Sequence, residues 1–350
     1  MKITLPVRKA ILKRQTYEAP AEGRWGKVRL DFNENTTGCS QAALRALRKL
    51  SAKELAMYPE YEAPTKILAR YFGVKPAELL LTNGGDDALR VFFDTFVEPG
   101  THILICEPTF PMYRYYAEIA GARVETLRYG RQMEFPLAAA LAALEKQPRV
   151  FFLANPNNPT GTLVSHRELE QLLRAAANTV VVLDEAYAEF SGTHAIALTR
   201  KHPHLFIART FSKAAGLAAL RLGSVIANAD SLALLRRAMP PYPVNMAALV
   251  AAVAATKQRK AIAGYVAGTK RRREWFAAEL RNNGVRVYPS AANFLLADFG
   301  AGGPAFFRKL ARHNILVRER TKDLGPGFAR ITIGTQAELN KFLRLLRQKD

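Results

Sequence analysis

The chain has 350 residues, of which 49% are hydrophobic and 23% charged, and this is enough for one large domain or two fused ones. Aromatic residues make up 9%, which excludes a disordered protein, and no apolar run reaches the roughly 18 residues that a membrane-spanning helix needs. The two cysteines, Cys39 and Cys106, form neither a disulfide framework nor a metal-binding spacing. Together with the lack of a secretory signal pattern, they predict a cytoplasmic protein without a bound metal or a membrane anchor.

The net charge of +21 is concentrated at the two ends of the chain. Residues 1–30 contain eight basic and two acidic residues, and residues 256–350 contain 20 and seven, whereas the middle is nearly neutral. Such an asymmetry can accompany nucleic-acid binding. However, clusters such as Lys270–Arg273 lie on a helical pattern, without interleaved aromatic residues or zinc-finger spacing. We therefore predict a solvated basic surface and no specific nucleic-acid partner.

After a helical stretch over residues 41–50, short apolar runs alternate with amphipathic stretches from residue 79 onward. The predicted strands are Leu79–Thr82, His102–Cys106, Val124–Leu127, Val150–Ala154, Thr179–Leu183, Leu205–Arg209 and Leu222–Ala227. The predicted helices between them are Asp86–Phe96, Tyr113–Ile119 and His166–Ala177. Ser165 and Glu168 form a capping box at the start of the last helix. This alternation predicts an α/β fold in which a mostly parallel, seven-stranded sheet is covered by helices on both faces.

The alternation of strands and helices ends after Pro243. A long helical segment, Val244 to about Asn282, precedes strand candidates at residues 285–287, 293–297, 315–318 and 330–333. We predict a smaller α+β domain here, and because the N-terminal arm shares its basic character, we expect the two ends of the chain to pack near each other. The predicted division is a large domain at residues 51–245 and a small domain at residues 1–50 and 246–350.

Four short motifs lie at or just after the ends of predicted strands, where open parallel sheets bind ligands. The first is Thr82-Asn-Gly-Gly-Asp-Asp87, between a strand and a helix. Its glycines allow close approach of the backbone, and the free N–H groups that begin the helix form an anion site. Taken alone, this motif also fits a simple turn.

The other three motifs carry specific polar side chains. Asn155-Pro-Asn-Asn-Pro-Thr-Gly161 combines prolines that fix a loop with asparagines that donate directed hydrogen bonds. Asp184-Glu-Ala-Tyr187 places a carboxylate after the most apolar strand, where it needs a cation or several donors unless it is only a strand-end cap. Arg209-Thr-Phe-Ser-Lys213 contains a lysine whose burial would lower its pKa and suit Schiff-base chemistry.

Together and in this order, the motifs resemble those of the fold-type-I pyridoxal-phosphate aminotransferases, and in particular of the histidinol-phosphate aminotransferase family. Asn158 and Asp184 are 26 residues apart, Asp184 and Lys213 are 29 apart, and Arg221 follows Lys213 by eight. The resemblance extends from Leu30-Asp-Phe-Asn-Glu-Asn35 to Arg330-Ile-Thr-Ile-Gly334. It implies the fold-type-I architecture, a large cofactor-binding domain joined to a smaller one.

The resemblance also implies how pyridoxal 5′-phosphate would be held. Lys213 would bond the cofactor and then shuttle a proton between the substrate Cα and the cofactor C4′. Asp184 would pair with the pyridine nitrogen, and Tyr187 and Asn158 would hydrogen-bond the phenolic oxygen. Phe110 would stack on the ring, although the family often has tyrosine there. The cofactor phosphate would lie on the residues of the first and last motifs: Gly85, Asp86, Thr210, Ser212 and Arg221.

Substrate binding is implied by the same resemblance. Arg330 corresponds to the arginine that grips the carboxylate of the amino acid. Asn33 and Asn293 are expected to line the pocket. Tyr17 and Arg318 are candidates for the phosphate end of the substrate, and a surface role is an equal alternative for both.

The resemblance further implies a homodimer, because Tyr58 matches a tyrosine that reaches the neighbouring subunit's site. Two departures, Ala215 where an aromatic residue is common and Ala219 where glycine is usual, affect the expected shape of the pocket.

We predict a ping-pong aminotransferase that acts on small amino acids and 2-oxo acids. Histidinol phosphate and imidazole-acetol phosphate are the favoured pair, with glutamate and 2-oxoglutarate as the second couple, which places the enzyme in histidine biosynthesis. Aromatic transamination and decarboxylation of threonine phosphate remain alternatives on the same scaffold. A non-catalytic regulator that binds the cofactor and DNA is a further alternative, but such fusions carry an N-terminal module of about 60 residues, and 29 residues precede Leu30 here.

Overall fold

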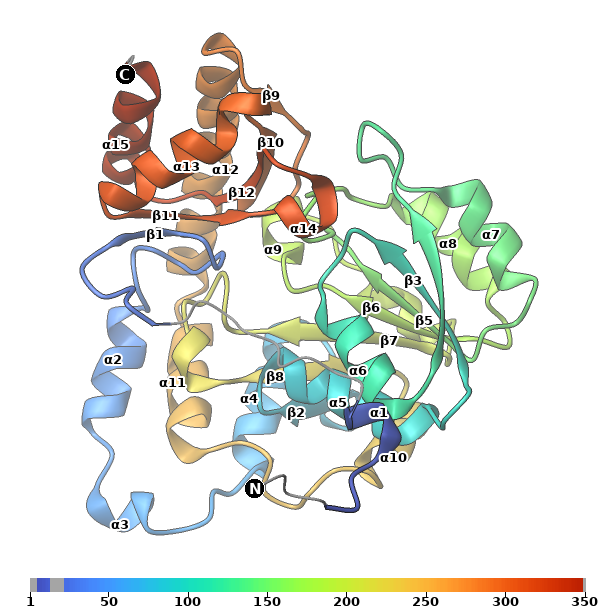
Figure 1. Cartoon of the computed structure of the whole chain (residues 1–350). Helices are drawn as coiled ribbons and strands as arrows, with labels where there is room; N and C mark the ends of the chain where they lie inside the picture. Colours follow the sequence, from blue (N-terminus) through green and yellow to red (C-terminus); the bar gives the residue numbers. More distant parts are fainter. Residues whose placement is uncertain (1–4, 13–21, 349–350) are drawn as a thin grey trace.

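The computed structural model describes residues 5–12 and 22–348, so the substrate candidate Tyr17 lies outside the described residues (Figure 1). The helices are α1 Lys9–Leu12, α2 Gln41–Arg48, α3 Ala52–Leu55, α4 Glu62–Phe72, α5 Gly84–Phe96, α6 Met112–Ala120, α7 Leu137–Leu144, α8 His166–Ala175, α9 Ala188–Ser191, α10 Ala229–Arg236, α11 Met246–Thr256, α12 Arg259–Asn282, α13 Gly303–Arg312, α14 Thr321–Leu324 and α15 Gln336–Arg347. The strands are β1 Val28–Leu30, β2 Leu79–Thr82, β3 His102–Glu107, β4 Arg123–Arg128, β5 Val150–Ala154, β6 Val180–Asp184, β7 Leu205–Thr210, β8 Gly223–Ile226, β9 Arg286–Val287, β10 Phe294–Asp298, β11 Ile315–Glu319 and β12 Phe328–Thr332.

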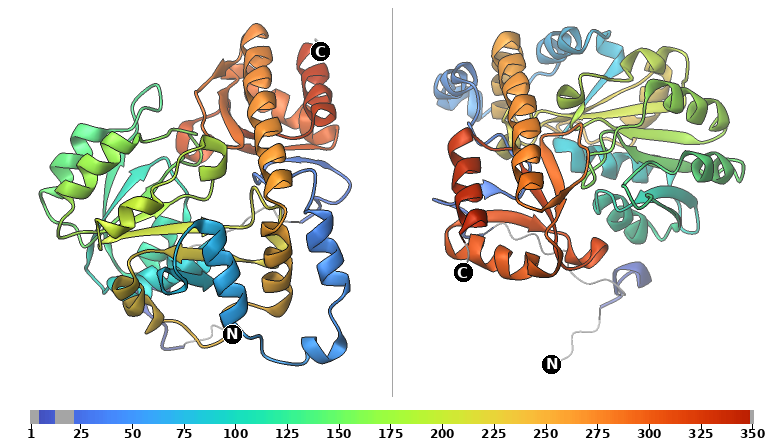
Figure 2. Two further views of the ribbon diagram at one scale, coloured as in Figure 1. Left: turned by 180° about the vertical axis from the view of Figure 1, so that it is seen from behind. Right: turned by 90° about the horizontal axis from the view of Figure 1, so that it is seen from above.

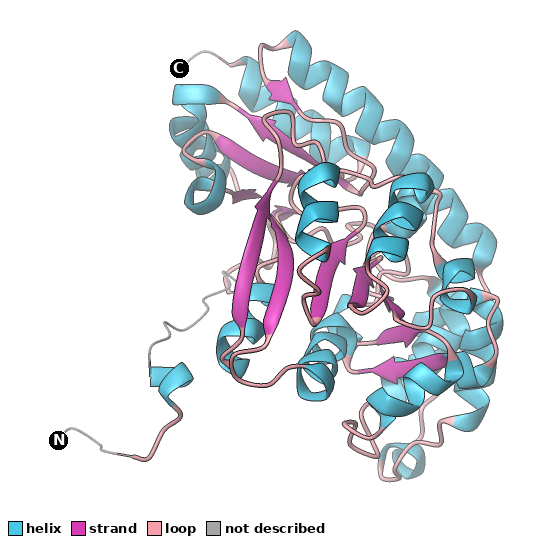
Figure 3. Cartoon of the chain, turned by 90° about the vertical axis from the view of Figure 1, so that its right-hand side faces the viewer, coloured by secondary structure: helices cyan, strands magenta, loops and turns pink. Residues whose placement is uncertain are grey.

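The large sheet has seven strands in the order β2-β8-β7-β6-β5-β3-β4, which confirms the predicted mostly parallel sheet. Only β8 among these strands runs against its neighbours, β2 and β7. Helices cover both faces of the sheet (Figure 3). The strand β5, which lies between β6 and β3, is buried throughout, and its side chains alternate between two cores. Phe151 and Leu153 join one cluster and Phe152 joins the other, as the period of two in a strand requires.

The small sheet has five strands in the order β1-β11-β12-β10-β9. Its β1 pairs in parallel with β11, so the N-terminal and C-terminal parts of the described chain meet in one sheet. Helices α12, α13 and α15 cover one face, where Phe276, Phe307 and Phe342 contribute to a core that is separate from those of the large sheet. Figure 2 shows α11 and α12 following one another along one side of the molecule.

The fold differs from the predicted elements in one divided helix and in several elements that were not predicted. The single helical stretch expected from Val244 to Asn282 is two helices, because the chain leaves helical geometry at Gln258, with φ −98° and ψ 45°. The apolar α11 packs on α2 and the large core, whereas α12 runs to the small sheet. The strand β1 was not predicted, and neither were several helices, of which the longer ones are α4, α7, α10, α13 and α15. In the part of the chain that the structure describes, no helix is long and apolar enough to cross a membrane.

Candidate active site

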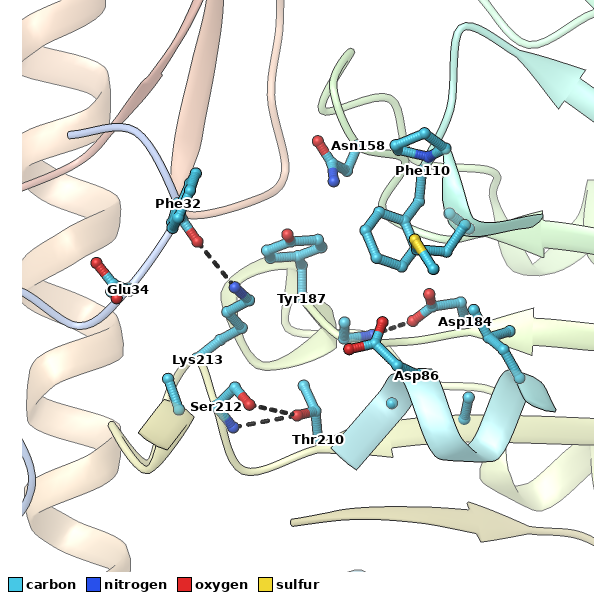
Figure 4. A pocket seen from close by; sticks show the side chains of 18 of the residues that line it. Phe32, Glu34, Asp86, Phe110, Asn158, Asp184, Tyr187, Thr210, Ser212 and Lys213 are labelled. Carbon is cyan, nitrogen blue, oxygen red and sulfur yellow. Dashed lines mark hydrogen bonds between the residues drawn. The ribbon is translucent and has the colours of Figure 1, made fainter. Parts of the chain in front are cut away.

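A cavity of about 640 Å³ lies at the carboxyl ends of β5, β6 and β7, beside the start of α5 and below β11 and β12. Because β8 is antiparallel to both β2 and β7, β2 points the same way as β7 and delivers the first motif to this edge. The structure therefore brings all four motifs together (Figure 4). Predicted site residues that line the cavity are Gly85, Asp86, Phe110, Asn158, Asp184, Tyr187, Thr210, Ser212, Lys213, Arg221, Arg318 and Arg330.

Lys213 extends into the cavity from the loop that follows β7 (Figure 4). Its Nζ donates a hydrogen bond to the carbonyl oxygen of Phe32 at 2.9 Å. Burial and, to a smaller extent, the positive charge of Arg330 lower the pKa of Lys213 from its ordinary value of 10.5 to about 8. A neutral amine is a nucleophile and a base, so this environment favours the reactive form of the side chain.

Asp184 ends β6 and presents a carboxylate to the same cavity. Its Oδ2 accepts a hydrogen bond from the Tyr113 hydroxyl at 2.7 Å, and its Oδ1 accepts one from the backbone N–H of Ala186 at 3.0 Å. Burial raises the pKa of Asp184, and the hydrogen bond from Tyr113 acts in the opposite direction. A carboxylate in this position is stabilised by a cation or a protonated nitrogen within the cavity.

Tyr187 is positioned by Asn33, which is in turn bound by Asn293. The Asn33 side-chain amide donates to the Tyr187 hydroxyl at 3.0 Å, and the Asn293 amide donates to the Asn33 carbonyl oxygen at 3.0 Å. Both asparagines are fully buried. The backbone of Asn33 has φ 55°, in the left-handed region that asparagine tolerates better than most residues. Asn33 and Asn293 thus lie in a layer behind Tyr187, outside the set of residues that line the cavity.

The start of α5 forms an anion site. The first N–H groups of this 13-residue helix have no partners within the helix, and the positive end of its dipole faces the cavity. Gly84 has φ 83°, in the left-handed region that favours glycine, and a Cβ there would lie 2.6 Å from a guanidinium nitrogen of Arg221, which would have to shift. Arg221 donates to Asp86 at 2.7 Å. On the other side, Thr210 and Ser212 are joined by a hydrogen bond of 3.0 Å between their hydroxyls.

Arg330 lies on β12 and is buried. Its guanidinium donates to the side-chain oxygen of Asn158 at 2.5 Å and to the backbone carbonyl of Asp31. Its Nε is buried and has no hydrogen-bond partner in the described structure. Burial lowers the pKa of Arg330 to about 10, yet the group stays charged at neutral pH. An unsatisfied guanidinium donor at a cavity wall is suited to bind an anionic ligand.

The sequence analysis missed several residues of the site. Tyr113 was assigned only to a helix, and its bond to Asp184 spans 71 residues. Arg24 binds both Asp31 at 2.7 Å and Glu34 at 2.6 Å, and its guanidinium lies 4.1 Å from the centre of the Phe32 ring. This clamp fixes the segment that carries the Phe32 carbonyl and Asn33. The sequence signal for this clamp was the presence of two acidic residues, Asp31 and Glu34, shortly after Arg24.

Tyr58 lies away from the cavity of its own chain. It is 75% exposed and stacks on Tyr242, which is 53% exposed, with 4.3 Å between the ring centres. An exposed pair of stacked aromatic rings is unusual on a protein surface that faces only water.

Comparisons with known proteins agree with this geometry. The histidinol-phosphate aminotransferase of Geobacillus sp. (strain WCH70) is 37% identical over 92% of this chain and 89% of its own length. The crystal structure of histidinol-phosphate aminotransferase from Sinorhizobium meliloti in complex with pyridoxal-5′-phosphate has a TM-score of 0.90 and 24% identity, and the match covers 99% of this chain and 98% of that one. The L-threonine-O-3-phosphate decarboxylase from Porphyromonas gingivalis has a TM-score of 0.80 and 25% identity, over 91% and 98% of the two chains. Residues 26–346 match the family described as aminotransferase class I and II, so the chain belongs to that family.

Proposed function

We propose that this aminotransferase transfers the amino group of histidinol phosphate to 2-oxoglutarate, a reaction of histidine biosynthesis. The curated relatives at 33–37% identity carry this activity in their names and are covered along most of their length. The observation that carries the proposal is the cavity itself, in which Lys213 with its lowered pKa lies beside Asp184 and near the buried Arg330. Histidinol phosphate has a phosphate and no carboxylate, so an enzyme that accepts it needs a strong anion site beside the reacting amino group.

Pyridoxal 5′-phosphate is the cofactor, and the residues of the cavity fit each of its groups. Its phosphate fits the start of α5 and the hydroxyls of Thr210 and Ser212. Its pyridine nitrogen, when protonated, fits the buried carboxylate of Asp184, and its aldehyde fits the amine of Lys213. When bound, the cofactor supplies an electron sink for the pair released at the substrate Cα. We propose that Phe110 lies against its ring and that Tyr187 and Asn158 hydrogen-bond its phenolic oxygen.

The residues of the cavity would act on the proton of the substrate Cα. Lys213 Nζ would act as the base that removes the proton from the substrate Cα and carries it. Asp184 would hold a proton on the pyridine nitrogen of the cofactor, because its charge is costly in the buried site without a cationic partner. Tyr113 keeps the carboxylate in place, and Asn33 does the same for the Tyr187 hydroxyl.

The lowered pKa of Lys213 predicts how fast the apoenzyme takes up its cofactor at different pH values. Only the neutral amine attacks an aldehyde, and with a pKa of about 8 the neutral fraction rises through that pH and then levels off. An ordinary lysine would keep gaining reactivity up to about pH 10.4. Stopped-flow absorbance after mixing apoenzyme with pyridoxal 5′-phosphate measures the rate, with pyridoxal 5′-phosphate and free lysine as the reference. A rate that still climbs steeply above pH 9 would contradict the assigned environment.

A panel of amino donors tests the proposed reaction. Purified holoenzyme is given 2-oxoglutarate with histidinol phosphate, phenylalanine or O-phospho-L-threonine, and both glutamate and carbon dioxide are measured. The proposal requires that glutamate form fastest with histidinol phosphate. Release of carbon dioxide from O-phospho-L-threonine would favour the decarboxylase, whose fold this chain shares. Faster glutamate formation from phenylalanine would favour an aromatic aminotransferase.

We also propose that the enzyme is a homodimer with shared active sites. The exposed stack of Tyr58 and Tyr242, with Met57 56% exposed beside it, gives the chain an aromatic surface that a second copy could cover. In a two-fold dimer each site receives the other chain's copy of the same residue. Tyr58 would then contact the cofactor phosphate or the substrate of the partner.

Mixing two inactive variants tests the sharing. Chains with Tyr58→Ala and chains with Lys213→Ala should regain activity when subunits exchange, because one site of each heterodimer has neither defect. Lys213→Ala mixed with Asp184→Asn is the matched control, since both residues belong to one chain's site and no intact site can form. If subunit exchange is verified and only background activity remains in the first mixture, Tyr58 does not act in the partner's site.

Two further assignments remain proposals. We propose a large domain at residues 51–245 and a small domain built from residues 1–50 and 246–350, supported by the two sheets and their separate cores. Helices α2 and α11 pack on the large core and so form the junction between the two. We propose a cytoplasmic location, because the thiols of Cys39 and Cys106 are free, as is usual in a reducing compartment.

A further inference from the structure

Three arginines share the face of the small sheet that borders the cavity. Arg318 on β11 lies directly opposite Arg330 on β12. The backbone N–H of Arg320 donates to the Phe328 carbonyl at 2.9 Å, so the pairing of the two strands continues one step past β11. Side chains two residues apart on a strand point to the same face, and Arg320 therefore lies on the face of Arg318 and Arg330. All three line the cavity.

The other face of these two strands is apolar, so the arginine side chains cannot lie on it. Ile315 and Val317 of β11, with Ala329 and Ile331 of β12, pack into the core under α12, α13 and α15. The arginines alternate with these apolar residues and cannot turn toward the helices. The sheet thus fixes all three guanidinium groups on the side of the cavity.

Arg320 is held in place but is only partly satisfied. Its side chain is 12% exposed, and one terminal nitrogen is paired with Asp323, which lies three residues later in the short helix α14. Its Nε is buried and has no hydrogen-bond partner in the described structure, as is the case for the Nε of Arg330. Buried donors without partners cost free energy, so the arrangement favours an acceptor in the cavity.

Two of the carboxylates that line the cavity beside these arginines are already paired with other arginines. Glu34 is bound by Arg24 at 2.6 Å, and Asp86 by Arg221 at 2.7 Å. The charges of Arg320 and Arg318 both act to lower the pKa of Arg330, which burial has already lowered. Like charges on facing strand positions repel one another, and a bound anion removes that repulsion.

We propose that Arg320 is a substrate-binding residue that, beside Arg318 and Arg330, binds the phosphate of the substrate. This inference rests on the proposed function, since it takes histidinol phosphate as that substrate. A carboxylate is satisfied by one guanidinium fork, whereas a phosphate dianion offers three oxygens and two charges. The third arginine therefore favours phosphate over carboxylate substrates at this site.

The test compares ligands that differ in the phosphate. Holoenzyme with Arg320→Gln is assayed for kcat/KM with histidinol phosphate and with histidinol, and its dissociation constant for inorganic phosphate is measured by titration calorimetry. Arg320→Lys keeps the charge without the fork, and Arg308→Gln removes one charge from the exposed face of α13. Cofactor absorbance of each variant checks that the site is loaded and folded.

We expect Arg320→Gln to lower kcat/KM for histidinol phosphate by about 10- to 100-fold, the usual effect of a lost hydrogen bond to a charged group, and to leave histidinol nearly unchanged. Arg320→Lys should fall between, and Arg308→Gln should match the wild type. Equal losses for both substrates, or none, would overturn the role of Arg320. If the wild type does not prefer histidinol phosphate over histidinol, the proposed function fails. The titration with inorganic phosphate then decides by itself whether Arg320 binds phosphate. Weaker phosphate binding in Arg320→Gln then supports the assignment, and an unchanged constant overturns it.

Discussion

Replacing Lys213 with alanine should abolish covalent attachment of the cofactor and lower turnover by about a hundredfold to ten-thousandfold, the usual contribution of a positioned general base. Lys213 is the amine of the cavity with a pKa lowered to about 8, and its Nζ is already oriented by the Phe32 carbonyl. The absorbance spectrum measures the attachment, and a coupled glutamate assay measures the turnover.

The control for this variant is Lys260→Ala, which removes an exposed lysine near the start of α12. It should keep both the spectrum and the rate of the wild type. Substantial turnover in Lys213→Ala, with a cofactor spectrum like that of the wild type, would show that another amine performs the chemistry.

Replacing Asp184 with asparagine should leave the cofactor bound but lower turnover by about a hundredfold to a thousandfold. An amide has almost the shape of the carboxylate and can keep the hydrogen-bonding environment near Tyr113 and Ala186. It carries no charge, however, and cannot hold a proton on the facing nitrogen. Equilibrium dialysis of the cofactor and steady-state kinetics separate binding from rate.

Tyr113→Phe provides the matched comparison for Asp184→Asn. It removes one hydrogen bond to Asp184 and leaves the charge, so turnover should fall by less than about tenfold. Asp184→Asn with turnover close to that of the wild type would mean that the carboxylate does not face the cofactor nitrogen.

The large sheet could be predicted because most of its strands are buried on both faces, with the edge strand β4 as an exception. A strand such as Val150–Ala154 shows as an unbroken apolar run, and its bounds were predicted to the residue. Strand β6 begins and ends one residue later than predicted, since Asp184 continues the pairing with β5 through its backbone. The motif residues sit where these strands end, so the edge of the sheet that carries the site was predictable as well.

Other elements depend on contacts that the sequence does not display. Strand β1 is three residues long and forms because β11, almost 300 residues later, supplies its partner. The break between α11 and α12 lies at Gln258, where no proline or glycine marks it. The two helices pack on different cores, and this difference exists only in the folded structure.

The site residues also divide into those that could be predicted from local sequence and those that depend on contacts in the folded chain. Residues within the four motifs could be identified one by one, because each motif carries its polar groups close together in the chain. Tyr113 could not, since its role depends on a contact with Asp184 that only the folded sheet creates. Arg320 left only a partial signal: it follows Arg318 by two residues but lies past the end of the strand predicted at residues 315–318, and the shared face of the two side chains depends on strand pairing that continues to Arg320.

Peptide mapping after borohydride reduction tests most directly that the cavity holds the cofactor on Lys213. Reduction makes the bond between the cofactor and its lysine permanent, and mass spectrometry of the digested protein then identifies the labelled peptide. We predict a single adduct, on Lys213, with loss of the yellow absorbance band of the holoenzyme. An adduct on any other lysine, or no adduct on a protein that is active with histidinol phosphate, would contradict the account.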